Sequence, residues 1–113
     1  MIEKWIKDAL EYSLGTHSYE DVLESIYNGD MQLFANKGGC VVTQITKYPQ
    51  KKVLYIYLAG GDFDSVVSLN DEVVQYARSK ECDSLMQIGR LGWTKKLKEH
   101  GWEYKSACMT KVI

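Results

Sequence analysis

The fold of this chain is decided by one uninterrupted apolar stretch, Val53-Leu54-Tyr55-Ile56-Tyr57-Leu58-Ala59. Valine and tyrosines alternate along it with leucines and an isoleucine, so both faces of an extended segment would be apolar. A strand that is covered on both faces lies inside a sheet. The stretch therefore predicts an interior strand with other elements packed on each side of it.

The residues before this stretch predict two helices and two strands. Apolar residues recur at helical spacing over 2–13 and 19–27, with Gly15 as a stop signal and Ser18 as the cap of the second helix. Residues 31–35 and 40–48 have the composition of strands, and turn residues follow each of them. The three strands are expected to form an antiparallel meander.

The residues after the stretch predict a strand-helix-strand unit. A loop leads into a helix that runs to Lys80 and is capped by Asp64 or Ser65, followed by a strand over 84–88. A helix over 93–100, with Gly101 as its stop, and a final strand over 102–113 complete the chain. Because a strand-helix-strand crossover is right-handed and parallel, the prediction is an α+β fold of order ααβββαβαβ. Its central sheet is mixed but mostly antiparallel, with helices on both faces, and residues 1–113 are expected to form one domain.

Composition argues against several classes of function. The 14 basic and 15 acidic side chains give a net charge of −1, so no binding to nucleic acid is expected. Charges interrupt the apolar residues of the N-terminal Met-Ile-Glu-Lys-Trp, which predicts neither a signal peptide nor a membrane span there. Cys40, Cys82 and Cys108 lack metal-ligand spacing and both histidines are isolated, so we expect no metal site and a reducing compartment.

The order of elements and the last half of the chain resemble the Gcn5-related N-acetyltransferase (GNAT) superfamily. The resemblance covers residues 18–113 and is carried by Tyr55 to Gly61, the helix to Ala77, Ser84 to Ile88, Gly89 to Trp93, and Lys98 to Glu103. A narrower resemblance rests on Gly60-Gly61, on Gly-Arg-x-Gly-Trp at Gly89 to Trp93, and on Gly101-Trp102. These three patterns are similar to those of short GNAT-like proteins encoded by tailed phages and prophages. Some of those proteins resemble internal virion or core proteins, which implies a location in the host cytoplasm or in the virion.

The GNAT resemblance implies a loop that binds the pyrophosphate of acetyl-CoA, with a Gln/Arg-x-x-Gly-x-Gly/Ala pattern before a helix. The candidate cofactor-binding residues of this chain are Gly60, Gly61 and Ser65. The pattern lacks its initial Gln or Arg, however, and Asp62 and Asp64 would repel a pyrophosphate. A turn that ends in an aspartate helix cap explains the same residues.

The superfamily resemblance also implies a tyrosine general acid four residues before the closing glycine, and this chain has Leu97 there. We therefore expect no catalytic residue and no cofactor. Arg90 and Trp93 are the candidate contact residues: Arg90 for an acid or phosphate, Trp93 for stacking on a ligand. The alternative for both is structural, with Trp93 anchoring the last helix and Arg90 bonding to a carboxylate or to strand-end carbonyls.

Three functional hypotheses follow. The first is a phage-type GNAT-like protein without acetyltransferase activity that acts through protein association, as a virion component or in assembly, or through self-association. The second is an active acyl-CoA-dependent N-acyltransferase with a divergent pyrophosphate loop. The third is a small inhibitor of a host factor.

Overall fold

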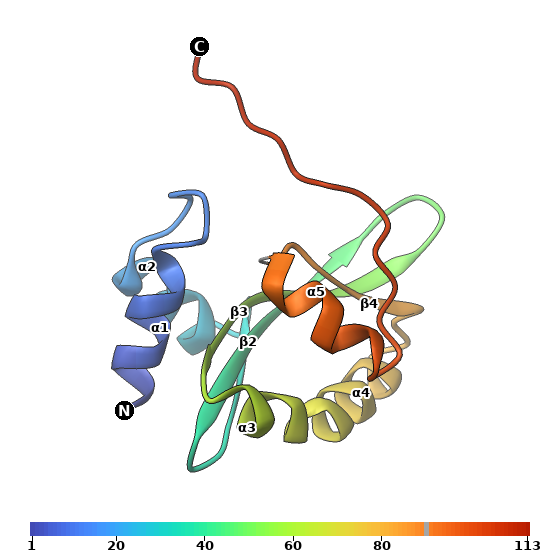
Figure 1. Ribbon diagram of the computed structural model, residues 1–113, viewed down its shortest axis with the longest axis horizontal. Coiled ribbons are helices and arrows are strands. Elements are labelled where there is room, and N and C mark those ends of the chain that lie inside the picture. The colour runs from blue at the N-terminus through green and yellow to red at the C-terminus, as the bar shows by residue number, and fades with distance from the viewer. Residues whose placement is uncertain (90) are drawn as a thin grey trace.

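The computed structural model describes every residue of the chain except Arg90 and, within the last helix, the side chains of Leu91 and Thr94 and the burial of Gly92. Its elements follow the order α1 (Ile2–Leu10), α2 (Tyr19–Tyr27), β1 (Gln32–Ala35), β2 (Gly39–Lys47), β3 (Lys52–Gly61), α3 (Phe63–Ser68), α4 (Asn70–Ser79), β4 (Ser84–Gln87) and α5 (Leu91–Lys98) (Figure 1). The strands form one sheet in the order β1-β2-β3-β4.

The interior strand is confirmed as β3, because it pairs with a neighbour on each side. It runs antiparallel to β2, and the pair Leu54↔Leu85 belongs to a parallel ladder with β4. Leu54 is completely buried. The sequence predictions of an antiparallel meander followed by a parallel crossover are therefore correct.

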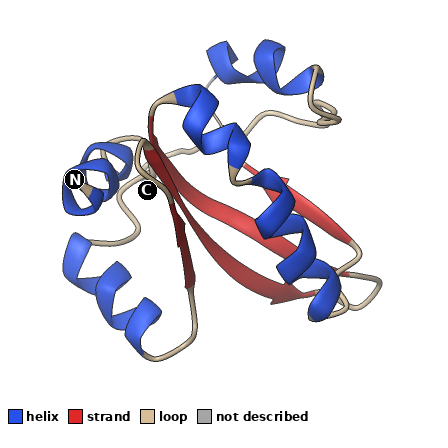
Figure 2. Ribbon diagram, turned by 90° about the horizontal axis from the view of Figure 1, so that it is seen from below, coloured by secondary structure: helices blue, strands red, loops and turns tan. Residues whose placement is uncertain are grey.

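Helices cover both faces of the sheet, as predicted (Figure 2). Helices α1 and α2 pack on one face, over a cluster of buried side chains: Trp5, Ile6, Val22, Met31, Cys40, Val42 and Leu58. Helices α3 and α4 pack on the other face, over a second cluster: Phe34, Val41, Leu54, Leu69, Val73 and Ala77. Apolar burial on both faces accounts for the lack of polar alternation along β3.

The two N-terminal helices form where the sequence predicts them. Ser18 caps α2 in a capping box: its hydroxyl accepts from the Asp21 amide, and the Asp21 carboxylate accepts from the Ser18 amide. Helix α1 ends at Leu10, earlier than the predicted residue 13. A turn follows α1 through Leu14 and Gly15. Both residues have a positive φ, which is incompatible with a continued right-handed helix.

The single helix predicted up to Lys80 is wrong, because Leu69 separates α3 from α4. The Ser65 carbonyl accepts from the Ser68 hydroxyl and from the Asn36 side-chain amide, at 2.7 and 2.9 Å. The Leu69 amide turns to the Val66 carbonyl instead, three residues back. Side-chain bonds have replaced the helical bond at this point, which ends α3.

The predicted cap residue of this region is also wrong. Asp62, rather than Asp64 or Ser65, caps α3, because the strand ends at Gly61 and the helix begins at once with Phe63. Asp62 has the extended backbone of a capping residue, with φ −75° and ψ 135°.

The predicted final strand is wrong as well. Residues 102–113 have no secondary structure, and every residue from Glu103 to Ile113 is exposed. Figure 1 shows this segment, the tail, leaving α5 and ending well away from the sheet. Strand-type composition alone does not make a strand, because a strand needs a neighbour that takes up its backbone bonds.

Among the described residues, no helix has both the length and the apolar character needed to cross a bilayer.

Candidate functional site

β3 is longer than β4, so the last residues of β3 have no strand partner on that side. The pairing of the two strands ends at Ile56↔Gln87, where β4 stops, while β3 continues to Gly61. On the β2 side, Thr43 pairs with Ile56 and Val42 with Leu58, which leaves Tyr57 without an opposite residue, as in a β-bulge. Bulges often lie next to functional sites, and this one lies one residue beyond the end of the β3–β4 pairing.

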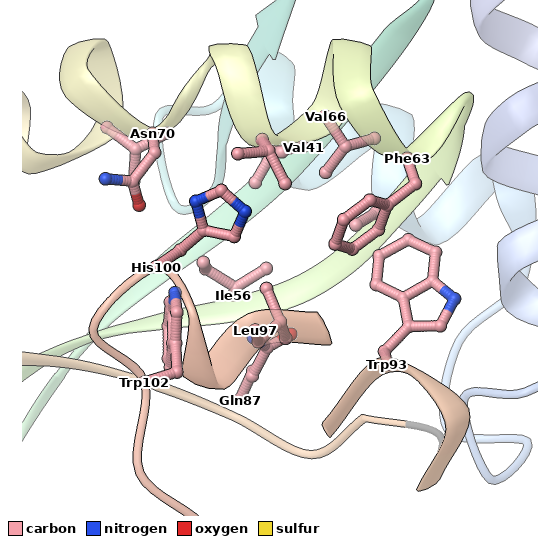
Figure 3. A pocket seen from close by; sticks show the side chains of 13 residues that line it. Val41, Ile56, Phe63, Val66, Asn70, Gln87, Trp93, Leu97, His100 and Trp102 are labelled. Atoms are coloured by element: carbon pink, nitrogen blue, oxygen red, sulfur yellow. The ribbon is translucent and has the colours of Figure 1, made fainter. Parts of the chain in front are cut away.

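A small apolar pocket lies beside the end of β4, on the face of the sheet that α3, α4 and α5 share (Figure 3). Its wall combines Val41, Ile56 and Ala59 of the sheet with residues of the three helices and with His100 and Trp102. The cavity has a volume of about 40 Å³. Sites for drug-sized ligands typically have volumes of roughly 300–1,000 Å³, so this space holds no more than a few water molecules.

Aromatic contacts between α3 and α5 form one wall of the pocket. Phe63 of α3 and Trp93 of α5 meet edge to face, with ring centroids 5.4 Å apart and an interplanar angle of 88°. The His100 ring lies 6.3 Å from that of Phe63, and the Lys96 ammonium lies 5.0 Å from the same ring. Figure 3 shows Phe63, Trp93, Leu97 and His100 directed into the space between the helices. Trp93 is half-buried.

The first turn of α3 is occupied by a carboxylate of the chain itself. The Asp62 carboxylate accepts from the Ser65 amide at 3.1 Å and from the Ser65 hydroxyl at 2.9 Å. An aspartate in this place takes up an amide that an external anion would otherwise use. Of the candidate cofactor-binding residues, Ser65 therefore already has an anionic partner.

Gly60 and Gly61 each fit against another part of the chain. A Cβ on Gly60 would lie 2.6 Å from the Trp5 carbonyl oxygen, so this glycine lets α1 approach β3. Gly61 has a φ of +102°, and a Cβ there would lie 2.3 Å from the Gly38 carbonyl oxygen. Close packing accounts for both glycines without a ligand.

A wider cleft of about 390 Å³ lies over Gly60 and Gly61, between α1 and α5. Asp8 and Glu11 are among its lining residues, together with Trp5 and Trp93. Two carboxylates in the wall make this cleft electrostatically unfavourable for a pyrophosphate.

Leu97 lines the small pocket with an apolar side chain, so no proton donor stands at the position that the superfamily resemblance gives to the general acid. Arg90 lies outside the described residues. Within the described part of the chain, no group of three His, Cys, Asp or Glu side chains is arranged to hold a metal ion.

A cluster that sequence reasoning missed lies on the opposite face, at the bulge. The Tyr57 hydroxyl lies 2.6 Å from the Thr16 hydroxyl and 2.9 Å from His17 Nδ1, which is itself 2.8 Å from the Thr16 hydroxyl. These bonds attach the α1–α2 connection to β3. Forty residues separate His17 from Tyr57, so no local pattern in the sequence could have indicated the cluster.

Burial shifts the pKa of two other polar groups in this part of the sheet. Burial raises the pKa of the Cys40 thiol, with a smaller opposing effect from the Gly60 amide. Burial also raises the pKa of the Tyr55 hydroxyl, and Tyr57 and Cys108 add to the effect. Both groups are therefore neutral near pH 7 and unsuited to act as nucleophiles or bases there.

Comparison with solved structures identifies the class of fold. A glucosamine-6-phosphate N-acetyltransferase from Arabidopsis thaliana is similar, with a TM-score of 0.66 and 17% identity over 97% of this chain and 91% of that one. A Trypanosoma brucei acetyltransferase matches with a TM-score of 0.65 and 13% identity over 100% and 96% of the two chains. A Thermus thermophilus protein matches with a TM-score of 0.66 and 15% identity over 100% of this chain and 93% of that one.

The chain therefore has a GNAT-like fold, as the sequence resemblance implied. At these identities the likeness concerns the fold and not the reaction. No protein-family model matches the sequence, and the search of curated proteins found no significant relative.

Proposed function

We propose that this protein uses a GNAT-like scaffold for protein association and does not transfer acyl groups. The observation that carries the proposal is that the chain's own groups occupy the cofactor region: the Asp62 carboxylate bonds to the first turn of α3, and the Phe63–Trp93 contact bridges α3 and α5. The wider cleft over Gly60 and Gly61 has carboxylates in its wall. The pantetheine arm of acetyl-CoA would have to displace the Phe63–Trp93 contact, because the cavity beside it has a volume of only about 40 Å³. Its pyrophosphate would have to displace a carboxylate.

The proposal includes a biological setting, a phage particle or its assembly in the host cytoplasm. It is supported by the resemblance of Gly60-Gly61, Gly89 to Trp93 and Gly101-Trp102 to patterns of phage-encoded proteins. It is also supported by exposed apolar side chains, since Tyr27, Met109, Val112 and Ile113 are each at least 90% exposed. Large exposed apolar groups often mark contact surfaces.

Isothermal titration calorimetry with acetyl-CoA tests the proposal. We expect no binding at micromolar concentration and no turnover with amine acceptors. Asp62→Asn/Asp64→Asn keeps a capping side chain at position 62 and removes both charges, so any residual affinity should rise. Asp71→Asn/Glu72→Gln removes the same charge from the first turn of α4 and is the matched control.

Micromolar binding by the natural sequence, with transfer of the acetyl group, would overturn the proposal. Purified virions from the source give a second test of the biological setting. They should contain this chain at a fixed copy number, and its absence from intact particles and from assembly intermediates would contradict that setting.

The second candidate function is acyl transfer by a divergent site. The bulge at Tyr57, next to the end of the β3–β4 pairing, favours it, together with the acetyltransferases among the similar structures. It requires α5 to move away from α3 and Trp93 to leave Phe63. The calorimetric experiment decides between the two functions, since only this one predicts that acetyl-CoA binds.

A further inference from the structure

Charged side chains are segregated along this chain. Residues 1–36 contain two basic and seven acidic side chains, whereas residues 91–113 contain five basic and two acidic ones. The first of these segments includes α1 and α2, and the second includes α5. The net charge of −1 therefore conceals an acidic region and a basic region. Opposite potentials of this kind favour association between the surfaces that carry them.

The exposed side of α2 is acidic and partly apolar. It consists of four exposed residues at helical spacing, Glu20, Leu23, Glu24 and Tyr27, which we call the acidic face. Leu23 and Tyr27 are 43% and 90% exposed, and no basic residue lies within α2. Neighbouring large apolar groups that are left in solvent often mark a contact surface.

The exposed side of α5 has the opposite charge. Lys95 and Lys98, which we call the basic face, are both exposed, and their spacing of three residues places them on one side of the helix. Within the described residues, no ion pair involves these lysines or the glutamates of the acidic face. Lys96, by contrast, lies over the Phe63 ring of its own chain. Both faces therefore carry charges that the described chain does not neutralise.

The two faces cannot meet within one chain. Helix α2 packs with α1 on one face of the sheet, through the buried Val22, whereas Trp93 and Leu97 of α5 line the pocket on the other face. Figure 1 shows α2 with α1 at the left of the molecule, apart from α5. A contact between the acidic face and the basic face therefore requires a second chain.

We propose that the basic face of α5 in one copy binds the acidic face of α2 in a second copy, head to tail. The occupant is a second copy because the same chain carries both faces, and their charges are complementary. Since the faces lie on opposite sides of the sheet, the contact repeats from copy to copy and builds an open chain of molecules. The inference rests on the proposed association function and names its first partner.

The dimensions of the two faces agree. A helical rise of about 1.5 Å per residue separates the two glutamates by about 6 Å along α2 and the two lysines by about 4.5 Å along α5. Two ammonium groups can therefore bond to two carboxylates across one contact between helices. The aliphatic stems of the lysines can cover Leu23, and the face of the Tyr27 ring can accept an ammonium group.

Sedimentation velocity of the full chain tests the contact. We expect species larger than a dimer as the protein concentration rises, and an association constant that falls about tenfold or more between about 0.05 M and about 0.5 M NaCl. Glu20→Lys/Glu24→Lys and Lys95→Glu/Lys98→Glu should each leave a monomer, because like charges then face one another. All four side chains are exposed, so both variants should keep the circular dichroism spectrum of the natural sequence.

A mixture of the two variants tests which surfaces meet. The first variant has two basic faces and the second has two acidic faces, so chains of the two kinds should alternate in a mixed assembly, although neither assembles alone. The matched controls make the same changes of charge at other exposed residues, Asp71→Lys/Glu72→Lys and Lys47→Glu/Lys51→Glu. Each control should assemble alone, like the natural sequence.

A natural chain that stays monomeric at about 100 μM, a concentration at which even weak specific contacts form, would overturn the inference. So would a variant of either face that assembles unchanged, or a mixture of the two variants that stays monomeric. These failures differ from failure of the proposed function. A monomer that does not bind acetyl-CoA removes only the head-to-tail contact, whereas turnover of acetyl-CoA removes the proposed function whether or not the chain assembles.

Discussion

The side chains of the meander are more deeply buried than those of the C-terminal third of this protein. The meander, strands β1 to β3 with α1 and α2, encloses side chains such as Val22, Val42 and Leu54 that are completely buried. From Ser84 onward, in the part that the structure describes, every residue is half-buried or exposed. The deeply buried side chains therefore lie before Ser84, while α5, the open edge of β4 and the tail belong to the weakly packed part.

Equal substitutions in the two regions should give unequal effects. Leu54→Ala removes a fully buried side chain from β3, and we expect a loss of about 2–5 kcal/mol in the free energy of unfolding. Leu97→Ala removes a half-buried side chain from α5, with an expected loss of about 1 kcal/mol. Urea denaturation followed by circular dichroism measures both. Equal losses would contradict the division of the molecule into these regions.

A second comparison uses two glycines. Gly60→Ala would place a Cβ 2.6 Å from the Trp5 carbonyl oxygen, a backbone atom that cannot turn aside. We expect the variant to lose about 1–3 kcal/mol of unfolding free energy, as other overpacked sites do. Gly89→Ala is the control, because its nearest neighbour would be a Gln87 side-chain atom at 3.7 Å. If the Gly60→Ala protein were as stable as this control, α1 would not need to approach β3 so closely.

The aromatic contact in the wall of the pocket should be weaker than a core contact. Trp93→Ala is expected to cost about 1–2 kcal/mol, below the roughly 3 kcal/mol expected for an indole inside a core, because Trp93 is half-buried. A double-mutant cycle with Phe63→Ala should give a coupling free energy of about 0.5–1.5 kcal/mol. Zero coupling would mean that the edge-to-face pair does not hold α5 against α3.

The smallest expected effect lies in the meander, at the cap of α2. Bonds from the Ser18 amide and hydroxyl lower the pKa of Asp21. A carboxyl with a lowered pKa in the folded state stabilises the protein above its unfolded pKa of about 4 and loses this contribution as the pH falls through the folded value. At pH 6 the natural protein should therefore have a higher melting temperature than the Asp21→Asn variant. The difference between the two melting temperatures should shrink below a pH of about 4. A difference that is constant with pH would exclude Asp21 as its source.

The sequence predicted the structure where neighbours along the chain decide it. The apolar run at β3, and the Ser18 cap with Asp21 three residues later, are local patterns that the structure reproduces. Predictions failed where a distant residue or another segment decides. Asn36 ends α3 from 29 residues away, Phe63 and Trp93 meet although α4 and β4 lie between them in the sequence, and the tail has the composition of a strand without a neighbour.

The bond from Asn36 to Ser65 also orders the events of folding. Before β1 and β2 pair and their turn brings Asn36 to the Ser65 carbonyl, only the local bond from the Ser68 hydroxyl competes with a continuous helix over residues 63–79. We therefore expect the boundary at Leu69 to form late, because it depends in part on a contact of long sequence separation. Transient helical structure through residue 69 should then precede the native break, in an early helix longer than either helix that the protein finally keeps.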